Sequence, residues 1–276
     1  MRGAGRGRIG RRVVRSAVAI AVAAAFVAPL GLLLVGSFRP EGLPPPRTIE
    51  LPPEPTLANY GRLGDLGPFW RSFGTSVWVA AVAVPASILV ASWAGFAAAR
   101  LPRNGALVVV AGAILALSVP ATALAVGRAV VYRELGLSGG PWPLLAPSLL
   151  GTTPIAVLVF AWRYRTLPPS VYDLARETGL SPVATWWRVV VPLTWSTTAG
   201  LAALVFVATW GNVLDPLFFV PDPRWATLPL AVRSLAALPA PSQPVMLAGA
   251  VVATVPAIAV VWVLLRRAAS GFGRER

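Results

Sequence analysis

The chain contains six long stretches without a single charged residue. They cover residues 16–38, 72–99, 104–127, 135–162, 189–214 and 234–265. Each is longer than the roughly 18 apolar residues that indicate a membrane span. Because backbone polar groups in lipid must be paired within the spanning structure, we expect these stretches to be helices. The sequence therefore predicts an all-α membrane protein with six transmembrane helices.

Composition supports a bilayer as the solvent. The mean hydropathy is +0.70, and only 12% of residues are charged, against about a quarter in soluble domains. Prolines fall within the predicted spans, among them Pro29, Pro85, Pro120, Pro154 and Pro256. Such prolines are tolerated where neighbouring helices satisfy the freed backbone groups. They are interpreted as part of ordinary bundle packing or, alternatively, as hinges.

Arginine sets the predicted orientation, because all 24 basic residues are Arg. Most of them flank the spans on the side that also holds both termini, which makes that side cytoplasmic. The predicted organisation is a basic cytoplasmic N-terminus at 1–12, a membrane domain at 13–266 and a cytoplasmic tail at 267–276. Within the membrane domain, a cytoplasmic loop is predicted at 168–192. The spans are predicted near 14–37, 72–99, 106–128, 143–162, 193–214 and 244–265. This places the chain in the cytoplasmic membrane as a multi-pass protein.

Two other interpretations of the charge pattern were weighed. The first apolar stretch imitates a secretory signal, but it lacks a small-residue cleavage site after its core, and retention as a first span is expected. A net charge of +14 could suggest nucleic acid, but the arginines are dispersed beside apolar stretches. Topology and contact with anionic membrane lipid explain them better, and no nucleic-acid partner is expected.

Missing residue types narrow the chemistry. The chain has no Cys, His or Lys, which excludes thiol catalysis, the usual histidine sites and a P-loop lysine. The uncharged stretches also offer no intramembrane ionisable group of the kind that proton-coupled transporters use. We therefore expect no enzyme activity, no metal site and no cofactor bound by this chain, and expect any driving energy to come from a partner.

A charged passage between the fourth and fifth predicted spans carries two helix signals. Pro168 and Pro169 forbid an earlier start, so Ser170 with Asp173 predicts a capping-box-like start to a helix over 171–178. Gly179 suits the left-handed position that follows a helix.

A second helix start follows at once. Ser181 is predicted as an N-cap with Pro182 at the first helical position, and the helix runs through Trp186, Trp187 and Arg188 towards Pro192. The passage is interpreted either as an interfacial hairpin with tryptophans in the headgroup belt or, preferably, as a docking surface for a cytoplasmic partner.

This passage, "YDLARETGLSPVATWWRVVVPL", resembles the EAA loop of permease subunits of ATP-binding-cassette (ABC) importers. Six further segments are similar to sugar-importer permeases, most closely to the second, six-span permease subunit of the maltose type. They are "FVAPLGLLLVGSFRP", "PPEPTLANYGRL", "ASWAGFAAARLPRNG", "LSVPATALAVGRAVVYRELGLSG", "TWGNVLDPLFF" and "WATLPLAVRSL". The resemblance implies a type I importer permease fold. It also implies that the loop is a coupling helix that docks on the ATPase.

The resemblance also implies partners and site residues. The partners are ABC ATPase subunits, which would hold ATP and Mg²⁺, a second permease subunit and an extracytoplasmic solute-binding protein. The implied coupling residues are Asp173, Leu174, Ala175, Thr178, Gly179, Pro182, Arg188 and Pro192. Two of them depart from the family pattern, since Asp173 replaces a Glu and Thr178 an Asp.

Cargo contacts are predicted with less support from the sequence. Sugars are held by aromatic stacking and amide hydrogen bonds, and Trp210 and Asn212 offer both near the fifth span. The alternative is a purely structural role, in which these two side chains only pack or form hydrogen bonds between helices. The predicted function is ATP-driven import of a sugar or related solute. The alternatives are a non-sugar importer permease or a self-contained secondary transporter or channel.

Overall fold

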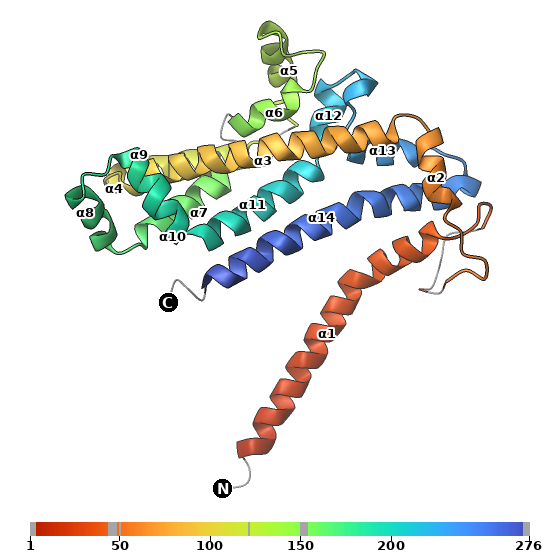
Figure 1. Cartoon of the computed structure of the whole chain (residues 1–276), viewed down its shortest axis with the longest axis horizontal. Coiled ribbons are helices and arrows are strands. Elements are labelled where there is room, and N and C mark those ends of the chain that lie inside the picture. The colour runs from red at the N-terminus through yellow and green to blue at the C-terminus, as the bar shows by residue number, and fades with distance from the viewer. Residues whose placement is uncertain (1–3, 44–48, 50, 121, 150–153, 273–276) are drawn as a thin grey trace. The chain divides into compact units, whose positions relative to one another are not determined.

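Helices make up all the regular structure that is described. The computed structural model describes residues 4–43, 49, 51–120, 122–149 and 154–272, and every regular element in these ranges is helical. The longest are α1 (Ala4–Ser37), α3 (Phe69–Ala99) and α14 (Gln243–Phe272), as Figure 1 shows. The predicted all-α class is confirmed.

Shorter helices connect the long ones. In chain order they are α2 (Ala58–Asp65), α4 (Arg103–Ser118), α5 (Ala125–Glu134), α6 (Trp142–Leu149), α7 (Pro154–Arg165), α8 (Pro169–Glu177), α9 (Pro182–Thr185), a π-helical turn (Trp186–Val190), α10 (Val191–Leu193), α11 (Trp195–Trp210), α12 (Leu214–Phe219) and α13 (Leu228–Leu235). Single 3₁₀ turns lie at Pro223–Trp225 and Ala240–Ser242.

Three of the described helices are long and apolar enough to cross a membrane. The qualifying segments are Val14–Ser37, Phe69–Ala99 and Gln243–Ala269, and a fourth arises if the bent pair Pro182–Leu193 and Trp195–Trp210 is one span. The helix over the predicted span 106–128 ends at Ser118, just before Pro120, where proline disfavours continuation. The span at 143–162 contains α6 and α7, separated by residues outside the described ranges. The count of six remains a prediction.

The chain divides into two compact units. One comprises residues 1–69 and 232–254, and the other residues 70–231 and 255–276. In the first, the buried amide of Asn59 in α2 donates to the carbonyl oxygens of Ser37 and Arg39, at 2.8 Å each. The hydroxyls of Ser37 and Tyr60 lie 2.7 Å apart. These bonds fix α2 against the end of α1.

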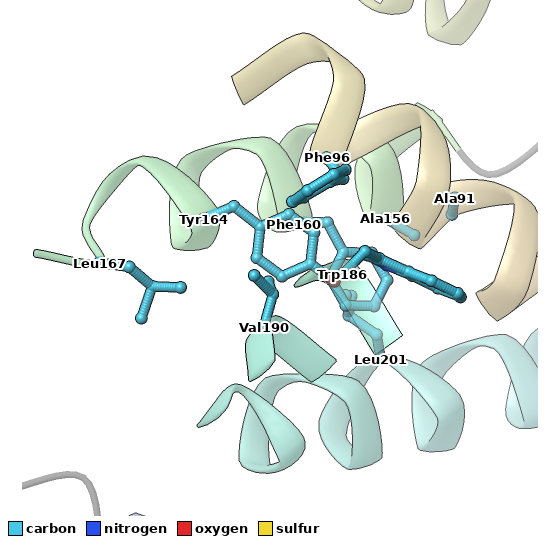
Figure 2. Close-up of a cluster of buried hydrophobic side chains, with 9 residues drawn as sticks. All are labelled: Ala91, Phe96, Ala156, Phe160, Tyr164, Leu167, Trp186, Val190 and Leu201. Atoms are coloured by element: carbon cyan, nitrogen blue, oxygen red, sulfur yellow. The ribbon is translucent and has the colours of Figure 1, made fainter. Parts of the chain in front are cut away.

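The second unit contains two described clusters of buried side chains. The larger one, drawn in Figure 2, comes from α3, α7, the π-helical turn and α11, with Leu167 from the segment between α7 and α8. Phe160 and Tyr164 of α7 are completely buried in it. Gly95 of α3 allows α7 to approach, because a Cβ at that position would lie 2.5 Å from Phe160 Cβ. A small residue thus sets the spacing of two helices, as is common in membrane bundles.

The chain bends sharply between α10 and α11. The two helical segments that meet there are inclined by 85°. Thr194 lies at the bend, is fully buried, and donates from Oγ1 to the carbonyl oxygen of Val190 at 2.8 Å. This bond pairs a carbonyl at the end of the helix. The passage 182–193 is therefore a separate element set against α11.

Candidate functional site

The helix α8 begins two residues earlier than the sequence predicted, at Pro169 in place of Val171. Pro169 is its first residue, and Pro168, in an extended conformation, precedes it without a side-chain cap. The prediction that Ser170 caps the helix together with Asp173 is therefore wrong. The physical reason is that proline at the first helical position has the required φ and lacks an N–H that would otherwise be unpaired.

The end of α8 matches its prediction. Gly179 has φ +71°. Its N–H bonds to the carbonyl oxygen of Arg176 at 2.9 Å, and the N–H of Leu180 bonds to that of Ala175 at 3.0 Å. These two bonds form a Schellman motif, which requires the left-handed conformation that glycine adopts without cost. The predicted role of Gly179 in ending the helix is confirmed.

The start of the second helix is also as predicted. The N–H of Ala184 donates to Ser181 Oγ at 3.2 Å, and Pro182 is the first residue of α9. The helix widens into a π turn, in which the N–H of Val191 reaches the carbonyl oxygen of Trp186. Pro192 follows directly and has no N–H to offer, which fits a local change of hydrogen-bond register.

A hydrogen-bonded chain fastens this passage to α3 and α7. Trp186 Nε1 donates to Ser92 Oγ at 2.9 Å, and the same hydroxyl lies 2.6 Å from Tyr164 Oη. Tyr172 Oη of α8 donates to the Tyr164 carbonyl at 2.7 Å. Burial raises the pKa of the Tyr172 phenol, so it stays protonated and remains a donor at neutral pH. Both short helices are thus tied to one buried network.

Two arginines strengthen the same attachment. The Arg165 guanidinium donates to the carbonyl oxygens of Ala98, Ala99 and Leu101, at 3.0–3.2 Å, at the end of α3. Carbonyls at a helix end have no partner four residues on within the helix, although that of Ala98 also accepts from the N–H of Leu101 at 3.3 Å. A cation at a helix C-terminus is favourable. Arg100 lies 4.0 Å from the Phe96 ring centroid and 5.3 Å from that of Tyr172.

The coupling residues implied by the resemblance fall on one exposed passage, with one exception. Exposed side chains are those of Asp173, Leu174, Thr178, Pro182, Arg188 and Pro192, and Gly179 is exposed between the helices. Ala175 is the exception, with 3% of its surface exposed, whereas Leu174 is 62% exposed. The outward face of α8 therefore combines an exposed leucine with charged neighbours.

The two predicted cargo residues lie in different surroundings. Trp210 is buried and packs edge-on against Phe73, with ring centroids 6.1 Å apart, and stacks on Phe206 at 5.4 Å. Asn212 follows α11 and lines a cavity. Its Nδ2 donates to Asp215 Oδ2 at 2.8 Å, and the Asp215 N–H donates to its Oδ1 at 3.1 Å.

Sequence reasoning missed the charges beside Asn212. Arg128 Nη1 of α5 donates to Asp215 Oδ1 at 2.9 Å, and its guanidinium lies 4.6 Å from the Phe219 ring centroid. Both charged residues are only about one-fifth exposed in their side chains, at 24% and 18%. The sequence did offer one signal for Arg128 and Asp215, because each directly follows an uncharged stretch. Their pairing across 87 residues was not visible.

Comparison with known proteins identifies relatives among transport permeases. The chain is 28% identical to the arabinooligosaccharide transport system permease AraQ of Halalkalibacterium halodurans, covering 88% of each. It is 26% identical to the trehalose transport system permease SugB of Mycobacterium tuberculosis, covering 80% of this chain and 81% of the relative. It is 27% identical to the lactose transport system permease LacG of Rhizobium radiobacter, covering 72% of each. No family model matches the chain.

A solved structure has the same fold. A chain in the crystal structure of a bacterial ABC transporter involved in import of the acidic polysaccharide alginate superposes with a TM-score of 0.78 at 16% identity, covering 96% of this chain and 98% of that one. The predicted ABC-importer fold is thus confirmed. The resemblance to sugar-importer permeases is confirmed as well, because the relatives are permease subunits of sugar transport systems.

Proposed function

We propose that this chain is a permease subunit of an ABC importer that moves a sugar or related solute across the cytoplasmic membrane. ATP and Mg²⁺ would bind to a separate ATPase subunit. The observation that carries the proposal is the exposed helix pair α8–α9, hydrogen-bonded to α3 and α7, in a chain whose relatives are sugar permeases. The chain needs no catalytic group of its own for this role.

The outward face of α8 suits docking on a cytoplasmic ATPase. Leu174 offers an exposed apolar anchor, Asp173 offers a carboxylate, and Thr178 closes the helix by donating to the Leu174 and Ala175 carbonyls at 2.9 and 3.1 Å. Arg188 and Pro192 extend the surface along the second helix. Ala175 faces inward, and its small size allows α8 to pack on the bundle.

The coupling would work by differential binding. An ATPase dimer that closes on ATP binds one permease conformation better than the other and shifts the population towards it. Inverting a 1:99 equilibrium requires about 5.5 kcal/mol of such preference. The solute would then enter from a solute-binding protein on the outer side, through a path shared with a second permease subunit. Trp210 would shape this path by packing, and Asn212 would line it and position Asp215.

Purification from the native membrane tests the proposal. A tagged chain is extracted in gentle detergent, and co-purifying proteins are identified by mass spectrometry. We expect an ABC ATPase, a second permease and a solute-binding protein. Recovery of the chain alone, under conditions in which known importers stay assembled, would contradict the proposal. The recovered complex is then reconstituted and assayed for uptake of arabinooligosaccharides, trehalose and lactose, the cargoes named for the relatives.

A further inference from the structure

The cavity beside Asn212 contains polar groups that folding alone does not explain. It has a volume of about 180 Å³ and is lined by residues of α3, α6, α11 and α12 and by Thr227. A single water needs only about 10–15 Å³ on the same measure. The cavity therefore has room for a group the size of one sugar ring.

Thr227 supplies a hydroxyl that no described residue satisfies. Only 6% of its surface is exposed, it lines the cavity, and its buried Oγ1 has no hydrogen-bond partner in the described part of the chain. Rotation about χ1 exchanges the hydroxyl with another staggered position and would turn it towards the cavity. Leaving a buried hydroxyl unpaired costs about 1–3 kcal/mol. The neighbouring main chain is fixed, because the N–H of Leu228 donates to Ser76 Oγ at 2.8 Å.

Asp215 supplies a carboxylate that is held in place and still has free hydrogen-bond acceptor positions. Its two oxygens accept one bond each from the side chains of Arg128 and Asn212. A carboxylate has about four acceptor positions, so both oxygens can accept further bonds. The positive charge of Arg128 balances the negative charge of Asp215, so the pair does not select for a charged ligand. Donors from a neutral molecule fit this arrangement best.

The remaining walls suit a molecule with polar edges and apolar faces. Ser87 and Thr209 add hydroxyls to the lining, while Val79 and Leu144 add apolar surface. Hydroxyls around a ring can bond to the carboxylate and threonine groups, while the C–H face of the same ring packs on aliphatic side chains. This combination distinguishes a polyhydroxylated ligand from an apolar or ionic one.

We infer that this cavity is a binding subsite for one neutral, polyhydroxylated ring of the transported solute, with the Thr227 hydroxyl and the Asp215 carboxylate as its hydrogen-bonding groups. The inference rests on the proposed function and adds specific contacts to it. Asn212 acts there mainly through Asp215, which its amide positions.

The test compares uptake by reconstituted complexes carrying Thr227→Val, Thr227→Ser or the control Thr198→Val. The control hydroxyl bonds to its own helix at the Thr194 carbonyl oxygen, 3.2 Å away. The probe is whichever of the three sugars named above the wild-type complex transports fastest, at low concentrations of sugar-loaded binding protein. We expect Thr227→Val to lower the uptake rate about tenfold, the loss expected for one buried hydrogen bond, and Thr227→Ser and Thr198→Val to stay within about twofold.

Monodeoxy analogues of the same sugar separate direct contact from a change in packing. If Thr227 bonds to a sugar hydroxyl, the analogue lacking that hydroxyl is transported equally by wild type and Thr227→Val, because the paired losses are not additive. Equal uptake of the parent sugar by both proteins would overturn this inference alone, as would a Thr227→Val defect of the same size for every analogue. Uptake of none of the three sugars by the complete complex would overturn the sugar assignment and the inference together.

Discussion

Gly179 shows how far a single residue can be predicted. Its left-handed φ and the two bonds around it follow from local chemistry, because only the adjacent turn of helix takes part. The same holds for Ser181 and Pro182. Ser170 was wrongly predicted because two local signals competed, and the proline preceding it determined the start of the helix.

Replacing Gly179 should uncouple the two helices of the passage. We expect Gly179→Val to abolish ATP-driven uptake or ATPase co-purification, because a β-branched residue resists positive φ. Gly179→Asn is the matched control, since asparagine tolerates this conformation, and it should retain most activity. Normal uptake by Gly179→Val would show that the turn is not needed in this form. A milder loss is expected for Asp173→Ala, which leaves the backbone unchanged.

Ser92 is a second residue whose importance is out of proportion to its size. Ser92→Ala removes the hydroxyl that accepts from Trp186 Nε1 and lies within hydrogen-bond distance of Tyr164 Oη. We expect the free energy of unfolding to fall by about 1–3 kcal/mol, the cost of buried groups left unpaired, as measured by thermal unfolding in detergent. Ser118→Ala is the control, because that hydroxyl is exposed and bonds within its own helix. Equal stability of the two variants would contradict a structural role for the network.

Individual helices could be located from the sequence more easily than their ends. Three of the predicted spans, 14–37, 72–99 and 244–265, correspond to α1, α3 and α14, whose bounds lie close to those predicted or extend beyond them. The end of α4 before Pro120 was missed, because hydropathy alone continues past a proline that disfavours the helix. The start of the fifth span at 193 was predicted to within two residues of α11, but the 85° bend at Thr194 depends on packing that hydropathy does not report. The ion pair between Arg128 and Asp215 was hidden for the same reason, since it joins two elements remote in sequence.

The contact of α3 with α7 gives a prediction at the scale of elements. Gly95→Ala should lower the free energy of unfolding by about 1–3 kcal/mol, because the new Cβ would overlap Phe160 and the backbone of α7. Gly112→Ala in α4 is the matched control, since a Cβ there meets nothing within 4 Å. It should be neutral or stabilising by up to about 1 kcal/mol. Chemical unfolding of both variants in the same detergent decides between these outcomes.

At the scale of the whole molecule, topology remains the principal prediction. Wild-type protein contains no cysteine, so single-cysteine variants report the side of the membrane without background. We expect a membrane-impermeant maleimide to label Glu54→Cys in intact cells, and to label Glu177→Cys only after the membrane is opened. Both native side chains are exposed. The reverse pattern would invert the proposed orientation and remove α8 from the cytoplasm.

The buried network around Ser92 has a mechanical consequence. Hydrogen bonds connect α8 and the π-helical turn to α3 and α7. A movement of the exposed face of α8 would therefore be transmitted directly to these two helices. A displacement of Leu174 would then tilt α3. The two short helices and α7 would then move together, with Gly179 at the turn between those two helices.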